Sequence, residues 1–210
     1  MNSKVEKELK EFLSRQKIIK REILSSSFNM ICEKIYLDSK KIYVAKYYQS
    51  ENIYFNSIIS ESNSLAYLSE KFPKLFPSIK YSSNELLLID FIEHNNIKDI
   101  NFQKILADEI LKIHKITNKK FGFDFDAQIG GLKQSNSYDG NWVKFYGEKR
   151  LGMIYEKINK KNAMPKFINK KIDTLLKNLD NYLPQKPNIS LLHGDLWSGN
   201  ILFNNGLILF

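Results

Sequence analysis

Glycine and proline are distributed unevenly along this chain of 210 residues. The first 72 residues contain neither, whereas all nine glycines lie from Gly122 onward. Since these two residues mark turns and irregular backbone, the difference indicates two regions that are built differently. No internal repeat or low-complexity linker separates the two regions.

Hydrophobic periodicity predicts the elements of both regions. Residues 4–16 have the apolar spacing of a helix, and two β-rich runs at 30–37 and 41–48 are typical of a hairpin. A helix is expected over 53–71, ended by the first proline, and a buried strand over 85–92. Helical spacing recurs at 102–117, 141–158 and 166–183. The pattern predicts an α+β fold in which a small β-rich lobe precedes a larger helical one.

Composition excludes several classes of protein. A hydrophobic content of 43% is enough for one core or two small lobes, and it argues against disorder. The net charge of +9 comes from lysines spread along the chain, which favours a solvated surface over nucleic-acid binding. The single cysteine, Cys32, excludes an intramolecular disulfide and fits a reducing cytoplasm. No apolar run has membrane-spanning length, and we expect a soluble protein without a signal peptide.

Chemistry-bearing residues are concentrated near the end of the chain. His193, Asp195, Leu196 and Asn200 have the spacing H-x-D-L-x-x-x-N of the protein kinase catalytic loop. There the Asp accepts the proton of the substrate hydroxyl and the Asn binds Mg²⁺. Two apolar runs follow, and the NNG between them at 204–206 is a type I′ turn signal, so we expect a hairpin.

Two upstream residues fit the same interpretation. A kinase needs a strand Lys for the phosphates of ATP and a helix Glu that holds this Lys. Lys46, in the run Val44–Ala45–Lys46, and Glu61, at the start of an apolar helix face, have the required order. Each taken alone could be an ordinary surface charge. Their position ahead of the loop leads us to expect an ion pair between them.

The segment LLHGDLWSGN, residues 191–200, resembles the catalytic loop of the fructosamine and ketosamine kinases, which are similar to aminoglycoside phosphotransferases. Its Trp-Ser-Gly insert distinguishes this family from protein kinases. Residues 121–151, with their FGF, IG, Q-x-N, W-x-x-F and RL elements, resemble a second segment of the family. The resemblance covers nearly the whole chain after about residue 20.

The resemblance implies a two-lobed protein-kinase-like fold that uses ATP and Mg²⁺. Residues 1–92 would form the N-lobe and 93–210 the C-lobe. Asp195 would be the catalytic base and Asn200 a metal ligand. Lys46 and Glu61 would position the nucleotide, and the backbone of a hinge would pair with the adenine edge; the hinge residues are Asp90, Phe91 and Ile92.

The resemblance also suggests roles for other residues of the family motifs. Trp197 and Trp142 could stack on the sugar of the substrate, although aromatic residues are more often part of a core. His193 would support the loop. Gly194 and Gly199 would permit backbone geometry that is closed to other residues.

The sequence departs from the family pattern at two places. The loop over the phosphates usually has paired glycines, but Ser25 and Ser26 occupy these positions in LSSSFNM here. Serine offers hydroxyl donors but approaches phosphate less freely. The family also places a second acidic metal ligand directly after the final hairpin. Since the sequence stops at Phe210, the resemblance implies a C-terminally truncated chain, and we expect it to be inactive or poorly stable alone.

The sequence therefore predicts a kinase that phosphorylates the 3-hydroxyl of a fructosamine or related ketosamine, free or protein-bound. A phosphotransferase for another hydroxylated small molecule and a non-catalytic nucleotide-binding fragment remain alternatives. The sequence does not indicate an oligomeric state.

Overall fold

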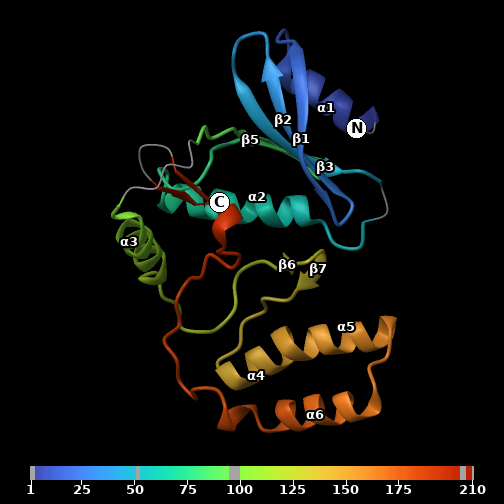
Figure 1. The fold of residues 1–210 in the computed structure, drawn as a ribbon, viewed down its shortest axis with the longest axis vertical. Helices are drawn as coiled ribbons and strands as arrows, with labels where there is room; N and C mark the ends of the chain where they lie inside the picture. Colours follow the sequence, from blue (N-terminus) through green and yellow to red (C-terminus); the bar gives the residue numbers. More distant parts are fainter. Residues whose placement is uncertain (1–2, 51–52, 95–99, 204–206, 210) are drawn as a thin grey trace. The chain divides into compact units, whose positions relative to one another are not determined.

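The computed structural model describes residues 3–50, 53–94, 100–203 and 207–209 (Figure 1). The chain forms two compact units, one of Met1–Ala107 with Gly194–Phe210 and one of Asp108–His193. The fold is α+β, as expected. Within the described ranges, no helix combines the length and apolar character that crossing a bilayer requires. The lobe boundary expected between residues 92 and 93 stays a prediction.

The first unit is built on a five-stranded sheet in which each neighbouring pair is antiparallel. Its order is β1 (Ile18–Ser27), β2 (Met30–Leu37), β3 (Ile42–Tyr48), β5 (Leu86–Asp90) and β4 (Ile79–Ser82). The expected hairpin of β2 and β3 and the expected strand β5 are confirmed. Strands β1 and β4 were not expected from the sequence. Most side chains of β1 are exposed, so β1 lacks the apolar alternation of a half-buried strand.

Helix α1 (Ser3–Leu13) covers one face of this sheet. Its buried side is formed by Val5, Leu9 and Leu13, which are in the same core cluster as the strand residues Ile31, Ile35, Leu37, Tyr43, Ala45, Tyr47, Leu86 and Leu88. The helix begins one residue earlier and ends three residues earlier than expected, because Ser14 adopts a positive φ of 54° and the helical backbone stops there.

Helix α2 (Ser57–Lys71) packs against β4 and β5. It begins four residues later than expected, since the side chain of Asn56 accepts a hydrogen bond from Ile59 N at 3.1 Å and caps the helix. It ends at Lys71, two residues before Pro73, as expected. The Oγ atom of Ser82 in β4 donates to Ser62 Oγ at 2.7 Å, which links this helix to the edge of the sheet.

Helix α3 (Phe102–His114) spans the boundary of the two units, and the rest of the second unit is mainly helical. A short hairpin, β6 (Ala127–Ile129) with β7 (Leu132–Gln134), precedes the helices. The helix expected over 141–158 is confirmed in outline as α4 (Trp142–Tyr146), a π-helical segment (Gly147–Gly152) and α5 (Met153–Lys161). The helix expected over 166–183 consists of α6 (Lys166–Lys177) and the short 3₁₀ turn Leu179–Asn181.

The chain returns to the first unit after residue 193. A 3₁₀ turn (Ser198–Asn200) leads into β8 (Ile201–Phe203), which pairs antiparallel with β9 (Leu207–Leu209). The expected hairpin is therefore confirmed, whereas its turn at 204–206 lies outside the described residues. The ring of Phe203 packs edge-on against Phe102 at 4.4 Å between centroids, which anchors β8 at the start of α3.

Candidate active site

Lys46 in β3 and Glu61 in α2 form the expected ion pair. Lys46 lies between Ala45 and Tyr47 in β3, and the side chains of these two neighbours pack in the core against α1. Since successive side chains of a strand point to opposite faces, the Lys46 side chain projects from the other face of the sheet. That is the face on which Glu61 meets it. The two side chains expose 23% and 26% of their surface, so the pair is largely shielded from water.

The Lys46 side chain stays charged at neutral pH. Burial lowers the pKa of Lys46, but the attraction of the Glu61 carboxylate and the proximity of Cys32 outweigh burial and raise this pKa above its usual value. A persistent, partly buried ammonium group is suited to binding the phosphate oxygens of a nucleotide.

Strand register places two further side chains beside Lys46. Lys46 is opposite Cys32 of β2, and Cys32 is opposite Ser25 of β1, so the three form a row on one face of the sheet. Burial raises the pKa of the Cys32 thiol, although Lys46 and Ser25 oppose this shift. Cys32 is thus a protonated packing residue, while Ser25 contributes a hydroxyl to the row.

Ser26 faces the other way. It is in register with Ile31, which belongs to the core under α1, and it therefore lies on the face opposite Lys46. The segment expected over the phosphates, residues 24–30, is not an open loop, because β1 continues through both serines to Ser27. Phosphate binding by these serines stays a prediction. The extended pairing with β2 satisfies backbone groups that an open loop would leave to solvent or ligand.

Only Phe28 and Asn29 form the turn between β1 and β2. Both have positive φ, 50° and 64°, as a two-residue type I′ turn requires. Asparagine tolerates this geometry, whereas phenylalanine rarely adopts it. Asn29 Nδ2 donates to Ser50 O at 3.0 Å and Asn29 Oδ1 accepts from Ser50 N at 3.1 Å, which ties the turn to the segment after β3.

The three expected hinge residues lie at the end of β5. Asp90 is the last residue of the strand and forms an ion pair with Lys80 at 2.7 Å. Phe91 follows and donates its backbone N–H to Ile42 O at 3.3 Å, which holds the chain against the start of β3. Ile92 lies beyond the strand and is partly exposed.

Asp195 and Asn200 are joined within their loop. Asn200 Nδ2 donates to Asp195 O at 2.8 Å and to Asp195 Oδ2 at 2.9 Å. Asn200 N donates to Trp197 O at 2.9 Å, which closes the 3₁₀ turn. One side-chain amide thus fixes both the backbone and the carboxylate of Asp195, so the five-residue spacing has a structural reason.

The two glycines of the loop serve different purposes. Gly194 has a φ of +89°, and a Cβ atom there would meet nothing within 4 Å, so its role is backbone geometry as expected. Gly199 does not have a positive φ, but a Cβ atom there would lie 2.4 Å from two ring atoms of Trp197. The expectation for Gly199 is corrected: it makes room for the indole, whose residue is 60% exposed.

The loop offers oxygen donors of the kind that bind magnesium. Asn200 uses Nδ2 for both of these bonds, so Oδ1 is the atom that could ligate a cation, and Asp195 adds a carboxylate. Among the described residues, no group of three His, Cys, Asp or Glu side chains could hold a metal ion. The donors present fit an Mg²⁺ ion that is held jointly with nucleotide phosphates, since Mg²⁺ commonly takes one or two protein carboxylates.

Trp142 lies in an aromatic cluster of the second unit. Its ring centroid is 5.0 Å from that of Phe121, 5.2 Å from Tyr146 and 6.1 Å from Phe145. These contacts favour a packing role, and stacking on a substrate stays a prediction. Nearby, Arg150 donates to Ser135 O at 2.8 Å and to Asn136 Oδ1 at 2.7 Å. Arg150 belongs to the π-helical segment that the periodicity did not distinguish from α-helix.

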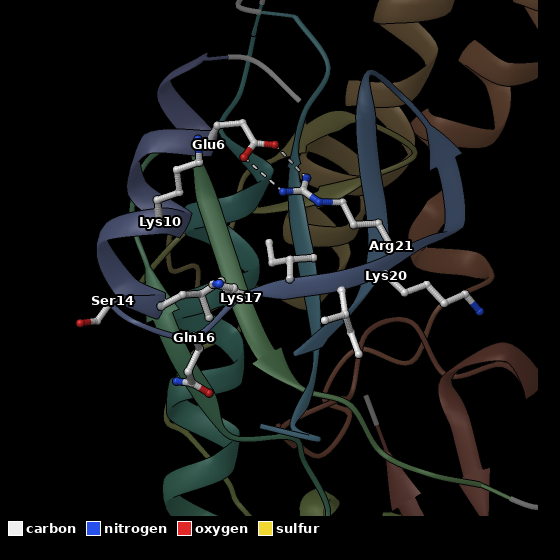
Figure 2. A pocket seen from close by; sticks show the side chains of 10 residues that line it. Glu6, Lys10, Ser14, Gln16, Lys17, Lys20 and Arg21 are labelled. Carbon is white, nitrogen blue, oxygen red and sulfur yellow. Dashed lines mark hydrogen bonds and ion pairs between the residues drawn. The ribbon is translucent and has the colours of Figure 1, made fainter. Parts of the chain in front are cut away.

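A cavity of about 630 Å³ lies between α1 and the start of β1 (Figure 2). Arg21 crosses it to Glu6, with 2.9 Å between Nη1 and Oε1, and Lys10, Lys17 and Lys20 line its rim. None of the expected site residues lines this cavity. It lies on the α1 side of the sheet, away from the face that carries Lys46, and is therefore separate from the candidate site.

Sequence comparison assigns the chain to a family. Residues 1–209 match the family described as fructosamine kinase. The chain is 36% identical over 124 residues to the chloroplastic protein-ribulosamine 3-kinase of Arabidopsis thaliana, a match covering 56% of this chain and 36% of that protein. It is 28% identical over 146 residues to a probable ketoamine kinase of Vibrio parahaemolyticus, covering 67% and 50%. The chain thus spans at most about half the length of these curated relatives.

Solved structures share the fold. A crystal structure from Thermobifida fusca assigned as a fructosamine-3-kinase has a TM-score of 0.82 at 19% identity, over 100% of this chain and 73% of that one. An ADP-bound aminoglycoside phosphotransferase, APH(2'')-Ib, has a TM-score of 0.59 at 19% identity, over 99% and 69%. The fold is therefore kinase-like. With the match over 209 of 210 residues, the chain belongs to the fructosamine kinase family.

Proposed function

We propose that this chain is part of an ATP- and Mg²⁺-dependent kinase that phosphorylates the 3-hydroxyl of a ketosamine. The observation that carries the proposal is the bond from the Asn200 amide to both the backbone and the carboxylate of Asp195. This bond orients a carboxylate and an amide oxygen from one loop, the two groups that phosphoryl transfer to a hydroxyl requires.

Lys46 and Glu61 position the nucleotide in this proposal. The Lys46 ammonium binds phosphate oxygens, and Glu61 keeps the lysine side chain extended across the face of the sheet. Ser25, in the same row, donates its hydroxyl to a phosphate. The backbone of Asp90, Phe91 and Ile92 pairs with the adenine edge. The ADP-bound phosphotransferase of similar fold supports a nucleotide in this class of fold.

Asp195 acts as the base. Its carboxylate accepts the proton of the acceptor hydroxyl while this oxygen attacks the γ-phosphorus of ATP, and ADP leaves with the electrons of the broken P–O bond. Asn200 would hold Mg²⁺ through Oδ1, while the Asp195 carboxylate stays available as the base. When it is bound, the ion offsets negative charge on the phosphates. Asn200 also keeps the carboxylate oriented through the 2.9 Å bond to Oδ2.

The acceptor is a ketosamine such as a fructosamine or ribulosamine, free or protein-bound. The names of the relatives, a protein-ribulosamine 3-kinase and a ketoamine kinase, support this class. The exposed indole of Trp197 offers a flat apolar surface for a sugar ring within the same loop as the base. The single cysteine and the absence of a bilayer-spanning helix among the described residues are compatible with the cytoplasm.

The test measures transfer of phosphate from ATP to a fructose-lysine conjugate by the full-length gene product, with ATP binding measured in parallel. Asp195→Asn should lower kcat by about 10²-fold to 10⁴-fold, since general base catalysis contributes this much. ATP affinity should change less than about threefold. Turnover within a few-fold of wild type would show that Asp195 is not the base, and ATP binding without transfer to any ketosamine would favour a nucleotide-binding protein.

A further inference from the structure

We infer that Lys34 binds the purine base of the nucleotide by resting its ammonium group on the face of the ring. The inference rests on the proposed function, since it assumes a nucleotide on the face of the sheet that carries Lys46. It adds a residue that the sequence motifs do not include.

Strand register puts Lys34 on the correct face. Lys34 of β2 is opposite Val44 of β3, and Cys32 is opposite Lys46. Because side chains two residues apart in a strand share a face, Lys34 and Val44 lie on the same face as Lys46, one step along the strands. This step leads toward Ile42, whose carbonyl accepts from the backbone N–H of Phe91 in the expected hinge. Lys34 therefore lies between the phosphate-binding lysine and the hinge.

The contacts of Lys34 are aromatic. Its Nζ atom lies 3.6 Å from the ring centroid of Phe91 and 4.9 Å from that of Tyr36. Glu22 of β1 is directly opposite Lys34. Its carboxylate accepts hydrogen bonds from Lys20 Nζ at 3.2 Å and from Tyr36 Oη at 3.0 Å. Those two bonds, more than Lys34, lower the pKa of Glu22. Glu22 is thus engaged mainly by other groups, and Lys34 is directed to the ring at the hinge.

This arrangement is suited to a flat base. An ammonium group gains energy over an aromatic face, most when the site is shielded from water. A purine that pairs with residues 90–92 presents another π-face beside Phe91, so Lys34 can rest on the base without leaving the hinge. The phosphates, by contrast, are left to Lys46.

The experiment compares binding of ATP and of inorganic tripolyphosphate by titration calorimetry. Lys34→Met keeps the length of the side chain but removes the charge. It should weaken ATP binding between about threefold and thirtyfold, the range expected for a cation over an aromatic ring, and leave tripolyphosphate binding unchanged. Lys34→Arg should retain most of the ATP affinity.

Lys20→Met is the matched control, because Lys20 also lies 4.9 Å from the Tyr36 ring but is on the edge strand β1. It should leave both affinities unchanged. Unchanged ATP binding by Lys34→Met, or an equal loss of affinity for ATP and tripolyphosphate, would overturn the role of Lys34 but leave the proposed function intact. A wild-type protein that binds tripolyphosphate but not ATP would overturn it as well, and one that binds neither would also contradict the proposed function.

Discussion

The ion pair of Lys46 and Glu61 and the loop of residues 194–200 belong to the same compact unit, but they are held by different interactions. Lys46 lies in the middle of a sheet, with neighbours set by the register of β2 and β5. Both members of the pair expose about a quarter of their side-chain surface.

The loop, in contrast, is mostly exposed and depends on its own short-range bonds. Asn200 hydrogen-bonds to Asp195, and the missing side chain of Gly199 leaves room for the Trp197 ring. Substitutions in the ion pair should therefore affect a partly buried charge. Truncation of exposed side chains in the loop should instead alter local geometry with little effect on folding.

The largest effect is expected at the buried pair. Lys46→Met removes the cation that we propose binds phosphate, and it leaves the Glu61 carboxylate partly buried. We expect kcat/KM for ATP-dependent phosphorylation to fall by about 10²-fold or more, the usual cost of removing one electrostatic contact to the reacting group. Steady-state kinetics with a fructose-lysine acceptor measures this loss.

Glu61→Gln is the companion variant. It removes only the support of Lys46 and should cost less, roughly tenfold, because the amide can still accept a hydrogen bond from the ammonium. Thermal unfolding of both variants separates loss of stability from loss of function. If Glu61→Gln were as inactive as Lys46→Met while remaining folded, Glu61 would have a role beyond holding the lysine.

A smaller effect is expected at Gly199. A Cβ atom would lie 2.4 Å from the Trp197 ring, so Gly199→Ala must displace the indole. We expect the KM for the ketosamine to rise about tenfold, in line with the loss of one aromatic contact, while the KM for ATP stays unchanged. Acrylamide quenching of Trp197 fluorescence, in a Trp142→Phe background, should change in parallel.

Gly194→Ala is the matched control in the same loop. It forces a side chain into a φ of +89° and should lower thermal stability without moving the Trp197 ring directly. If Gly199→Ala and wild type had equal fluorescence quenching and equal KM values, the Trp197 indole would not be a surface on which the sugar ring packs.

The smallest effect concerns a buried charge on the opposite face of β2. Glu33 is 4% exposed, and burial raises its pKa although Arg21 lies 3.2 Å away. Since the pKa is higher in the folded protein, Glu33 stabilises the fold below its unfolded pKa, and this contribution is lost as pH rises through the folded pKa. Glu33→Gln should therefore gain stability relative to wild type as the pH rises above the ordinary Glu pKa of about 4.3.

Urea unfolding at several pH values measures this difference. A stability difference that is independent of pH, or that falls as pH rises, would contradict the raised pKa of Glu33. Glu33 has no proposed role in the reaction, so its substitution measures the effect of a buried charge on stability alone. Substitutions of Lys46 and Glu61 would change stability and the proposed nucleotide binding together.

Much of the site could be predicted because its residues follow local spacing. The catalytic loop, Lys46 and Glu61 were found from the order of residue types, and the main helices from apolar periodicity. The edge strand β1 was missed because its serine-rich end and exposed side chains show no alternation. Residues 24–30 consequently seemed to form a loop, although pairing with β2 keeps residues 24–27 extended and leaves only Phe28 and Asn29 as the turn.

What the sequence determined by itself is which residues are the candidates for the reacting groups, because motif spacing and helical periodicity are properties of neighbouring residues. Only the tertiary structure decided which face each side chain occupies. Register across β1, β2 and β3 put Ser25 beside Cys32 and Lys46 but turned Ser26 to the other face. Such contacts join residues on neighbouring strands, and shifting a strand by one residue would reverse them. They therefore depend on strand register, which the sequence pattern of β1 did not reveal.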